Sequence, residues 1–145
     1  MEIRFASLEE ILLLRQAVII AGTGRDSPYF AGDHDVATRH VGAFEKDLCV
    51  GCATFLRSEW EGQPAWQLRG MATSLEWRGR GVGRALLSFA ENELRYESGV
   101  HVLWCNAREQ AAGFYQKMGW LIVSDRFDVR GAGPHYQMVK RLPDM

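Results

Sequence analysis

The chain has 145 residues, a hydrophobic fraction of 47% and a formal net charge of −1, which together predict one globular domain over residues 1–145. This charge excludes a general nucleic-acid binder, which needs a strong basic excess, although it is compatible with a locally basic pocket. No stretch reaches the roughly 18 uncharged apolar residues of a membrane span and no signal-peptide pattern follows Met1, so we expect a cytoplasmic protein with no nucleic-acid or membrane partner.

A strand and a helix are expected in the first 38 residues. Residues 2–6 alternate like a strand, and Ser7 with Glu10 forms a capping box at the start of a helix. The apolar stripe of this helix consists of Ile11, Leu14, Val18 and Ala21. Glycines end the helix, and the polar, irregular residues 22–38 could hold a short second one.

Three strands are predicted next, near residues 39–44, 48–57 and 65–73. The middle strand is apolar on both faces, as is typical of a central strand that is covered on each side. The link at residues 58–64 is polar and turn-like, which predicts antiparallel pairing of the second and third strands.

The three cysteines do not predict a disulfide framework, because their number is odd. Cys49 and Cys52 form a C-x-x-C inside a predicted strand, where residues three apart point to opposite faces. We therefore expect small buried side chains here rather than a shared metal site or a disulfide.

An amphipathic helix starting at Val82 gives the clearest periodic pattern in the chain. Its apolar positions are Val82, Ala85, Leu86, Phe89, Ala90 and Leu94, and Gly99 ends it. A strand at 100–105, a helix at 107–118 and strands at 120–129 and 135–142 follow. This order predicts an α/β (α+β) fold, in which a mixed, mostly antiparallel sheet of about seven strands is flanked by helices.

The densest chemical signal is the glycine loop that joins a strand to this helix, Arg78-Gly79-Arg80-Gly81-Val82-Gly83-Arg84. Unpaired N–H groups at a helix start can bind a phosphate, glycines allow the backbone to approach it, and arginines add charge. The alternative is a structural turn with solvated arginines. The spacing excludes a P-loop and a G-x-G-x-x-G dinucleotide fingerprint, because both would need glycine at position 84.

Two motifs resemble those of the GNAT N-acetyltransferases. The pattern Q/R-x-x-G-x-G/A, matched by Arg78, Gly81 and Gly83, resembles the pyrophosphate-binding loop of that superfamily. Residues 106–120, with Asn106 after a strand and then A-x-x-F-Y-x-x-x-G-W, resemble its second motif, and the element order is similar to the GNAT fold. The resemblance implies acetyl-CoA as cofactor and direct transfer of its acetyl group, in a ternary complex, to a primary amine of a small molecule or peptide.

The same resemblance implies roles for individual residues. Cofactor binding would fall to Met71, Ala72, Thr73, Arg78, Gly79, Arg80, Gly81, Val82, Gly83, Arg84 and Asn106. Tyr115 matches the position of the acid that protonates the leaving thiolate, although a thiol pKa near 8.5 makes this help optional. Tyr115 could equally be a core residue, because it shares the apolar side of its helix with Phe114.

The general base is where the chain departs from the family pattern. Many members place a glutamate about where Arg69 stands, but no carboxylate occurs between Glu61 and Glu76. A water chain, another segment or a largely neutral acceptor amine must then replace it. His135, in a Gly-Pro-His-x-x-Met run similar to the ending of some members, is the first candidate, and His40 is the second. Arg69 indicates either substrate binding through an anionic group on the acceptor or a structural ion pair.

Other readings stay open at this point. The missing glutamate is compatible with a non-catalytic acyl-CoA-binding or sensor domain on the same fold. The glycine spacing disfavours a small kinase or reductase. A protein-interaction module would expose tryptophans, but Trp66, Trp104 and Trp120 lie in or beside predicted strands, where core packing is expected. The run Asp33-His34-Asp35 is interpreted as a solvated turn, so no metal is expected, and a homodimer stays open because many GNAT relatives dimerise.

Overall fold

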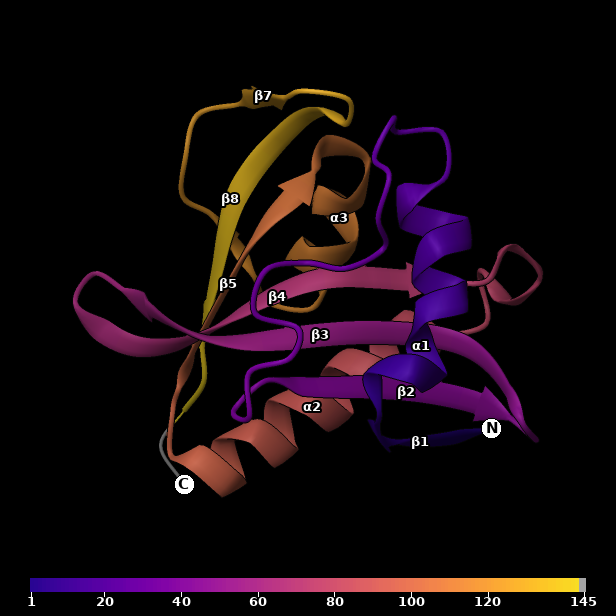
Figure 1. The fold of residues 1–145 in the computed structure, drawn as a ribbon. Coiled ribbons are helices and arrows are strands. Elements are labelled where there is room, and N and C mark those ends of the chain that lie inside the picture. Colours follow the sequence, from indigo (N-terminus) through magenta and orange to yellow (C-terminus); the bar gives the residue numbers. More distant parts are fainter. Residues whose placement is uncertain (144–145) are drawn as a thin grey trace.

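The computed structural model describes residues 1–143. The elements, in chain order, are β1 (Glu2–Ala6), α1 (Leu8–Arg15), the π-helical turn η1 (Gln16–Ile20), β2 (Arg39–Glu45), β3 (Leu48–Trp60), β4 (Gln63–Thr73), the 3-10 turn η2 (Leu75–Trp77), α2 (Val82–Ser98), β5 (Val102–Arg108), α3 (Glu109–Lys117), β6 (Leu121–Ile122), β7 (Phe127–Val129) and β8 (Gly133–Arg141). Figure 1 shows their arrangement. The predicted capping box of Ser7 and Glu10 is present and starts α1.

The strands form one mixed sheet in the order β1-β2-β3-β4-β5-β8-β6, with β7 paired to β8. Within residues 1–143 only β4 and β5 pair in parallel. Helix α1 packs on one face of the sheet, and α2 and α3 pack on the other (Figure 1). The predicted fold class is confirmed, with an eight-stranded sheet.

The parallel pair separates towards the carboxyl ends of its strands. Its last backbone partners are Leu68 and Cys105, and from Arg69 onwards β4 stays with β3 whereas β5 stays with β8. Gly70, with a φ of 64°, takes the left-handed conformation of a bulge at which the register of β3 and β4 shifts. The two strand ends therefore diverge, as Figure 1 shows, and leave backbone without a neighbouring strand between them.

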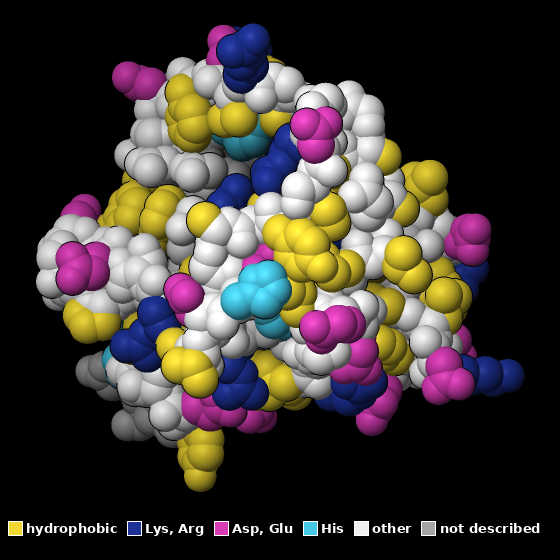
Figure 2. Space-filling model, in the orientation of Figure 1, with side chains coloured by type: hydrophobic (Ala, Val, Ile, Leu, Met, Phe, Trp, Pro, Cys, Tyr) yellow, Lys and Arg dark blue, Asp and Glu magenta, His cyan; other side chains and the backbone are white. Residues whose placement is uncertain are grey.

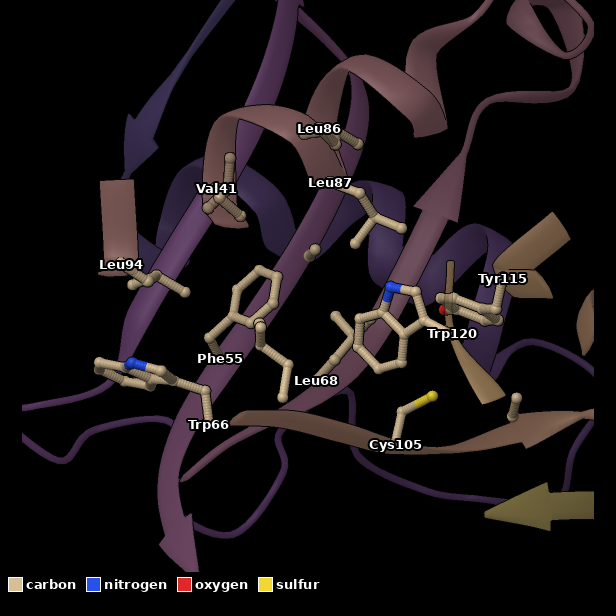
Figure 3. Packing of buried hydrophobic residues seen from close by; sticks show 14 of the residues in the cluster. Val41, Phe55, Trp66, Leu68, Leu86, Leu87, Leu94, Cys105, Tyr115 and Trp120 are labelled. Atoms are coloured by element: carbon tan, nitrogen blue, oxygen red, sulfur yellow. The ribbon is translucent and has the colours of Figure 1, made fainter. Parts of the chain in front are cut away.

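The main core lies between the sheet and the helices α2 and α3. Figure 3 shows Phe55 and Leu68 of the strands together with Leu86 and Leu87 of α2. All four are almost fully buried, and burying such a side chain contributes about 1.5–3 kcal/mol each. This packed layer gives the glycine loop and the start of α2 a rigid base.

The tryptophans belong to the core, as predicted. Trp66 and Trp120 are 3% and 1% exposed, and Trp104 is half-buried with its ring 5.5 Å from that of Trp60. The indole N–H of Trp66 donates a hydrogen bond to Ser98, and that of Trp120 donates one to Glu91. The indole N–H of Trp104 donates to Ser58. The tryptophans therefore do not form an exposed binding face.

The first helix differs from its prediction. After Arg15 the helix continues as the π-helical turn Gln16–Ile20, which changes the residues that face inwards. Arg15 and Ile20 are buried, whereas Ala21 of the predicted stripe is exposed. A pattern with a 3.6-residue period cannot anticipate the wider turn, and such turns often occur at functional sites. Among the described residues, 22–38 contain turns and no second helix.

Two strand boundaries also differ. The predicted strand at 120–129 is interrupted, because residues 123–126 separate β6 from β7. The predicted turn at 58–64 is much tighter, since β3 and β4 continue as a hairpin to Glu61 and Gly62.

The prediction that Cys49 and Cys52 face opposite sides of the sheet is wrong. A bulge leaves Val50 without a partner on β2, so both cysteines pack against the cluster under α1. Both are free thiols, and burial raises the pKa of Cys52 to about 12. The cysteines are apolar packing residues, and Cys49 is only half-buried.

Candidate active site

Two cavities meet at the diverging ends of β4 and β5. The loop cavity, of about 760 Å³, lies against the glycine loop and the start of α2. The arginine cavity, of about 520 Å³, lies between β4, β5, the β7–β8 turn and the segment after α1. The residues that line both are Ile19, Met71, Arg108, Ala111 and Tyr115. Molecules bound in the two cavities can therefore touch at this junction.

The loop cavity gathers most of the residues predicted to bind the cofactor. These are Met71, Ala72, Thr73, Arg78, Gly79, Gly81, Val82, Gly83 and Arg84. Arg80 does not line it, because its guanidinium lies over the Trp77 ring, 4.8 Å from the centroid. Asn106 lines the arginine cavity instead.

The start of α2 has the features of an anion site. Gly81 is the N-cap residue with a φ of 81°, and no side chain caps the helix. The first intrahelical bond runs from the Ala85 N–H to the Gly81 carbonyl, so the three N–H groups before it have no α-helical partner. These N–H groups carry the positive end of a 17-residue helix dipole, and Arg78 and Arg84 add charge beside them. A pyrophosphate fits this set of donors.

Tyr115 occupies the junction of the cavities. Its ring packs in the core beside Trp120 (Figure 3), and the two ring centroids are 5.3 Å apart. Its hydroxyl lies 3.5 Å from the Met71 Sδ. Burial raises the pKa of the phenol. The hydroxyl is therefore protonated at neutral pH and can donate a hydrogen bond into either cavity. Tyr115 is therefore a core residue, and it also lines both cavities, so its predicted role as an acid stays a prediction.

Four arginines line the arginine cavity. They come from four segments and are Arg25, Arg69, Arg108 and Arg130. No Asp or Glu lines it within the described part of the chain. In Figure 2, dark-blue Lys or Arg side chains and a cyan His side chain lie together in a hollow near the top of the face shown. The cavity is locally basic although the whole chain has a net charge of −1.

His135 also lines the arginine cavity, opposite Arg108 in the β5–β8 ladder. Its Nδ1 lies 2.8 Å from the Gly133 carbonyl oxygen. A carbonyl only accepts, so Nδ1 carries the hydrogen and Nε2 of the neutral ring holds the lone pair. No hydrogen-bond partner for Nε2 exists among residues 1–143. His135 can therefore accept a proton at Nε2.

His40, the second candidate for a base, lines neither cavity. It belongs to a buried network in which Arg15 donates to both carboxylate oxygens of Asp33, at 2.7 and 3.1 Å, and to the Thr54 hydroxyl at 2.7 Å. The Nδ1 of His40 lies 2.8 Å from the Thr54 hydroxyl oxygen, and its Nε2 lies 3.1 Å from the Asp33 carbonyl oxygen. Burial lowers the pKa of His40. His40 is thus a structural residue.

Phe30 ties this network to the arginine cavity, and sequence reasoning missed it. The guanidinium groups of Arg15, Arg25 and Arg69 lie 4.2, 5.0 and 4.3 Å from its ring centroid. Arg25 and Arg130 were missed as well, because they occur in irregular segments with no motif around them. Composition gave no signal either, because residues 22–38 contain one Arg and three Asp, and residues 123–132 contain two Arg and two Asp.

The residues that the structure describes show neither a candidate metal centre nor a helical membrane span. In residues 1–143 no group of His, Cys, Asp and Glu could hold a metal ion, and Asp33 of the Asp33-His34-Asp35 run is bound to Arg15. No helix in the described part of the chain is long and apolar enough to cross a membrane.

Comparison with known proteins yields acetyltransferases. Residues 36–121 match a family model described as an acetyltransferase (GNAT) domain. YitI of Bacillus subtilis (strain 168), described as an uncharacterized N-acetyltransferase, is 32% identical over 98% of this chain and 97% of its own length. The crystal structure of Escherichia coli ElaA superposes with a TM-score of 0.83 at 22% identity, covering 97% of this chain and 99% of ElaA. An aminoglycoside 6'-N-acetyltransferase complexed with coenzyme A superposes with a TM-score of 0.79 at 16% identity, covering 100% of this chain and 99% of that one.

Proposed function

The chain belongs to the GNAT acetyltransferase family, and from this membership we propose that it is an acetyl-CoA-dependent N-acetyltransferase acting on a primary amine of a small molecule or peptide. The observation that carries the proposal is the junction of the two cavities at Tyr115. One cavity offers a pyrophosphate site, and the other offers space for an amine. We infer further that residues 1–145 act as one catalytic domain.

Acetyl-CoA fits the loop cavity by the chemistry of its donors. The uncapped start of α2, with Arg78 and Arg84, would hold the pyrophosphate, and the unpaired side of β4 at Met71–Thr73 offers backbone groups to the pantetheine arm. Arg108, at the end of β5, lines both cavities and adds charge at their junction. When bound, acetyl-CoA supplies an activated thioester carbonyl.

Tyr115 and His135 are the proposed proton donor and acceptor. The Tyr115 hydroxyl is protonated, so it can donate a hydrogen bond to sulfur as negative charge develops there. The Nε2 of His135 can take a proton from the amine, directly or through water. Both side chains are buried and held by their neighbours, which fixes their orientation.

Direct transfer is favoured over a covalent enzyme intermediate. Cys105 lines the arginine cavity, but burial raises the pKa of its thiol to about 12, so the nucleophilic thiolate is scarce at neutral pH. The two cavities also join, which allows both substrates to bind at once. These observations support a ternary complex.

The test is release of free CoA thiol from acetyl-CoA in the presence of a panel of primary amines. Amine-dependent release, with acetylated product, supports the proposal.

A second candidate is a non-catalytic acyl-CoA sensor, which is favoured by the absence of any Asp or Glu from the lining of both cavities among the described residues. Tight acetyl-CoA binding with no release for any amine would support the sensor and contradict the enzyme.

A further inference from the structure

The arginine cavity has an excess of positive charge that residues 1–143 do not neutralise. The chain has 17 Lys and Arg against 18 Asp and Glu, yet the cavity is lined by four arginines and by no carboxylate of the described residues. The neighbouring acids Asp26 and Asp128 are exposed to solvent and do not line it. Such clustering is unfavourable in an empty pocket and favourable around a bound anion.

Arg69 is the arginine best prepared to bind an anion. It is partly buried and lies at the end of the β4–β5 pairing, where the strands diverge. Its guanidinium carbon lies over the Phe30 ring, 4.3 Å from the centroid, and the side chain forms no hydrogen bond or ion pair within residues 1–143. Because no described residue uses these N–H groups, they can bind a carboxylate through the guanidinium fork while the ring contact remains. The alternative of a structural ion pair for Arg69 thus finds no partner in the described part of the chain.

The nearest buried acid cannot serve as that partner. Asp33 has its two carboxylate oxygens bound by Arg15, and it also accepts a hydrogen bond from the Phe30 N–H at 2.7 Å. Arg15 and Asp33 therefore neutralise each other as a closed pair. Burial and the nearby Arg25 and Arg15 lower the pKa of Arg69, which is the result expected of a cation that lacks a counter-ion.

We propose that the acceptor is an anionic primary amine, that Arg69 binds its acidic group, and that polycationic amines are poor substrates. This inference rests on the proposed acetyltransferase function. Carboxylate and phosphate both match the fork of guanidinium N–H groups, so the shared chemistry is an oxyanion on the molecule that carries the amine. Arg25, Arg108 and Arg130 extend the same field around the cavity and would favour acceptors that carry more than one negative charge.

The inference separates this chain from proteins that share its fold. Two structural neighbours are described as aminoglycoside 6'-acetyltransferases, and an aminoglycoside carries several ammonium groups. Like charges in a low-dielectric pocket repel strongly. We therefore expect aminoglycosides to be rejected here although the fold is shared.

The experiment compares matched amines in steady-state acetyl transfer. The pairs are L-alanine and L-alaninamide, which lacks the carboxylate, and phosphoethanolamine and ethanolamine, with kanamycin as a polycation. The expected result is a higher kcat/KM for the anionic member of a pair and no turnover of kanamycin. Arg69→Gln should lower that preference about 10- to 100-fold, chiefly through KM, which is the range of one charge-assisted hydrogen bond. Which pair responds distinguishes a carboxylate from a phosphate.

Arg57→Gln is the matched control, because Arg57 is an exposed arginine stacked on Trp66 at 5.0 Å that lines neither cavity. A preference for neutral or cationic amines, or equal behaviour of the two variants, would overturn the inference and leave the acetyltransferase standing. If acetyl-CoA binds but no amine in the panel turns over, the Tm of the CoA complex with each amine replaces the rate. In that case the inference is overturned if an anionic amine raises the Tm of the wild-type complex no more than it raises the Tm of the Arg69→Gln complex. Failure to bind acetyl-CoA overturns the proposed function itself.

Discussion

Replacing Arg15 by Met should be one of the most destabilising single changes in this chain. Arg15 is fully buried, and its guanidinium donates to Asp33, Thr54 and the Pro28 carbonyl. Methionine fills similar space but leaves the fully buried Asp33 carboxylate with the Phe30 N–H as its one remaining donor among residues 1–143. Removal of one partner of a buried ion pair costs about 3–5 kcal/mol, whereas an exposed pair contributes at most about 1 kcal/mol.

The assay is urea unfolding in a double-mutant cycle. Arg15→Met should lower the free energy of unfolding by about 3–5 kcal/mol. Arg141→Met is the control, because it removes an exposed ion pair with Glu61, and it should lower the free energy of unfolding by at most about 1 kcal/mol. Arg15→Met combined with Asp33→Asn should cost clearly less than the sum of the single changes, because no buried charge is then left unpaired. Additive effects, or a loss below about 1 kcal/mol for Arg15→Met, would refute the reasoning.

Three further predictions concern single side chains. Tyr115→Phe should lower kcat about 10- to 100-fold with little change in acetyl-CoA affinity, since the ring and its packing remain; an unchanged kcat would remove Tyr115 from the chemistry. His135→Gln should lower kcat about 100-fold or more, as loss of a general base does, and an unchanged kcat would mean that another group takes the proton. Because burial lowers the pKa of His40 in the folded state, its protonation favours unfolding, so the free energy of unfolding should fall as pH drops below about 6.5. His40→Asn should flatten that slope while His34→Asn, at an exposed histidine, should not; equal slopes would show that His40 does not cause it.

Local patterns predicted most of the elements. The capping box at Ser7, the apolar stripe of α2 and the strands around β3 all follow from short-range periodicity, and the structure confirms them. The π-helical turn and the two bulges could not be predicted from these patterns. Each inserts one extra residue, and its one sign in the sequence is an interruption of the helical or strand alternation of apolar residues. The bulge at Val50 therefore reversed the expected direction of Cys49.

The candidate site was predictable where a motif carries it. The loop from Arg78 to Arg84 is contiguous in sequence, so its glycines and arginines could be read together, and all but Arg80 line the loop cavity. The arginine cavity is assembled from four distant segments. Arg25 and Arg130 converge there only after the sheet has formed, and no local pattern could have paired them.

Calorimetric titration with acetyl-CoA tests the central claim most directly. ATP and NADH are the specificity controls, because both also carry phosphate groups that a helix start could bind. Gly81→Val should abolish binding, because valine does not tolerate the left-handed N-cap that presents the α2 N–H groups. Gly99→Val is its matched control, since Gly99 is left-handed with open space around it at the other end of the same helix. We predict micromolar, selective binding of acetyl-CoA that survives Gly99→Val and is lost in Gly81→Val. No binding to the folded protein, or equal binding of ATP or NADH, would contradict the account.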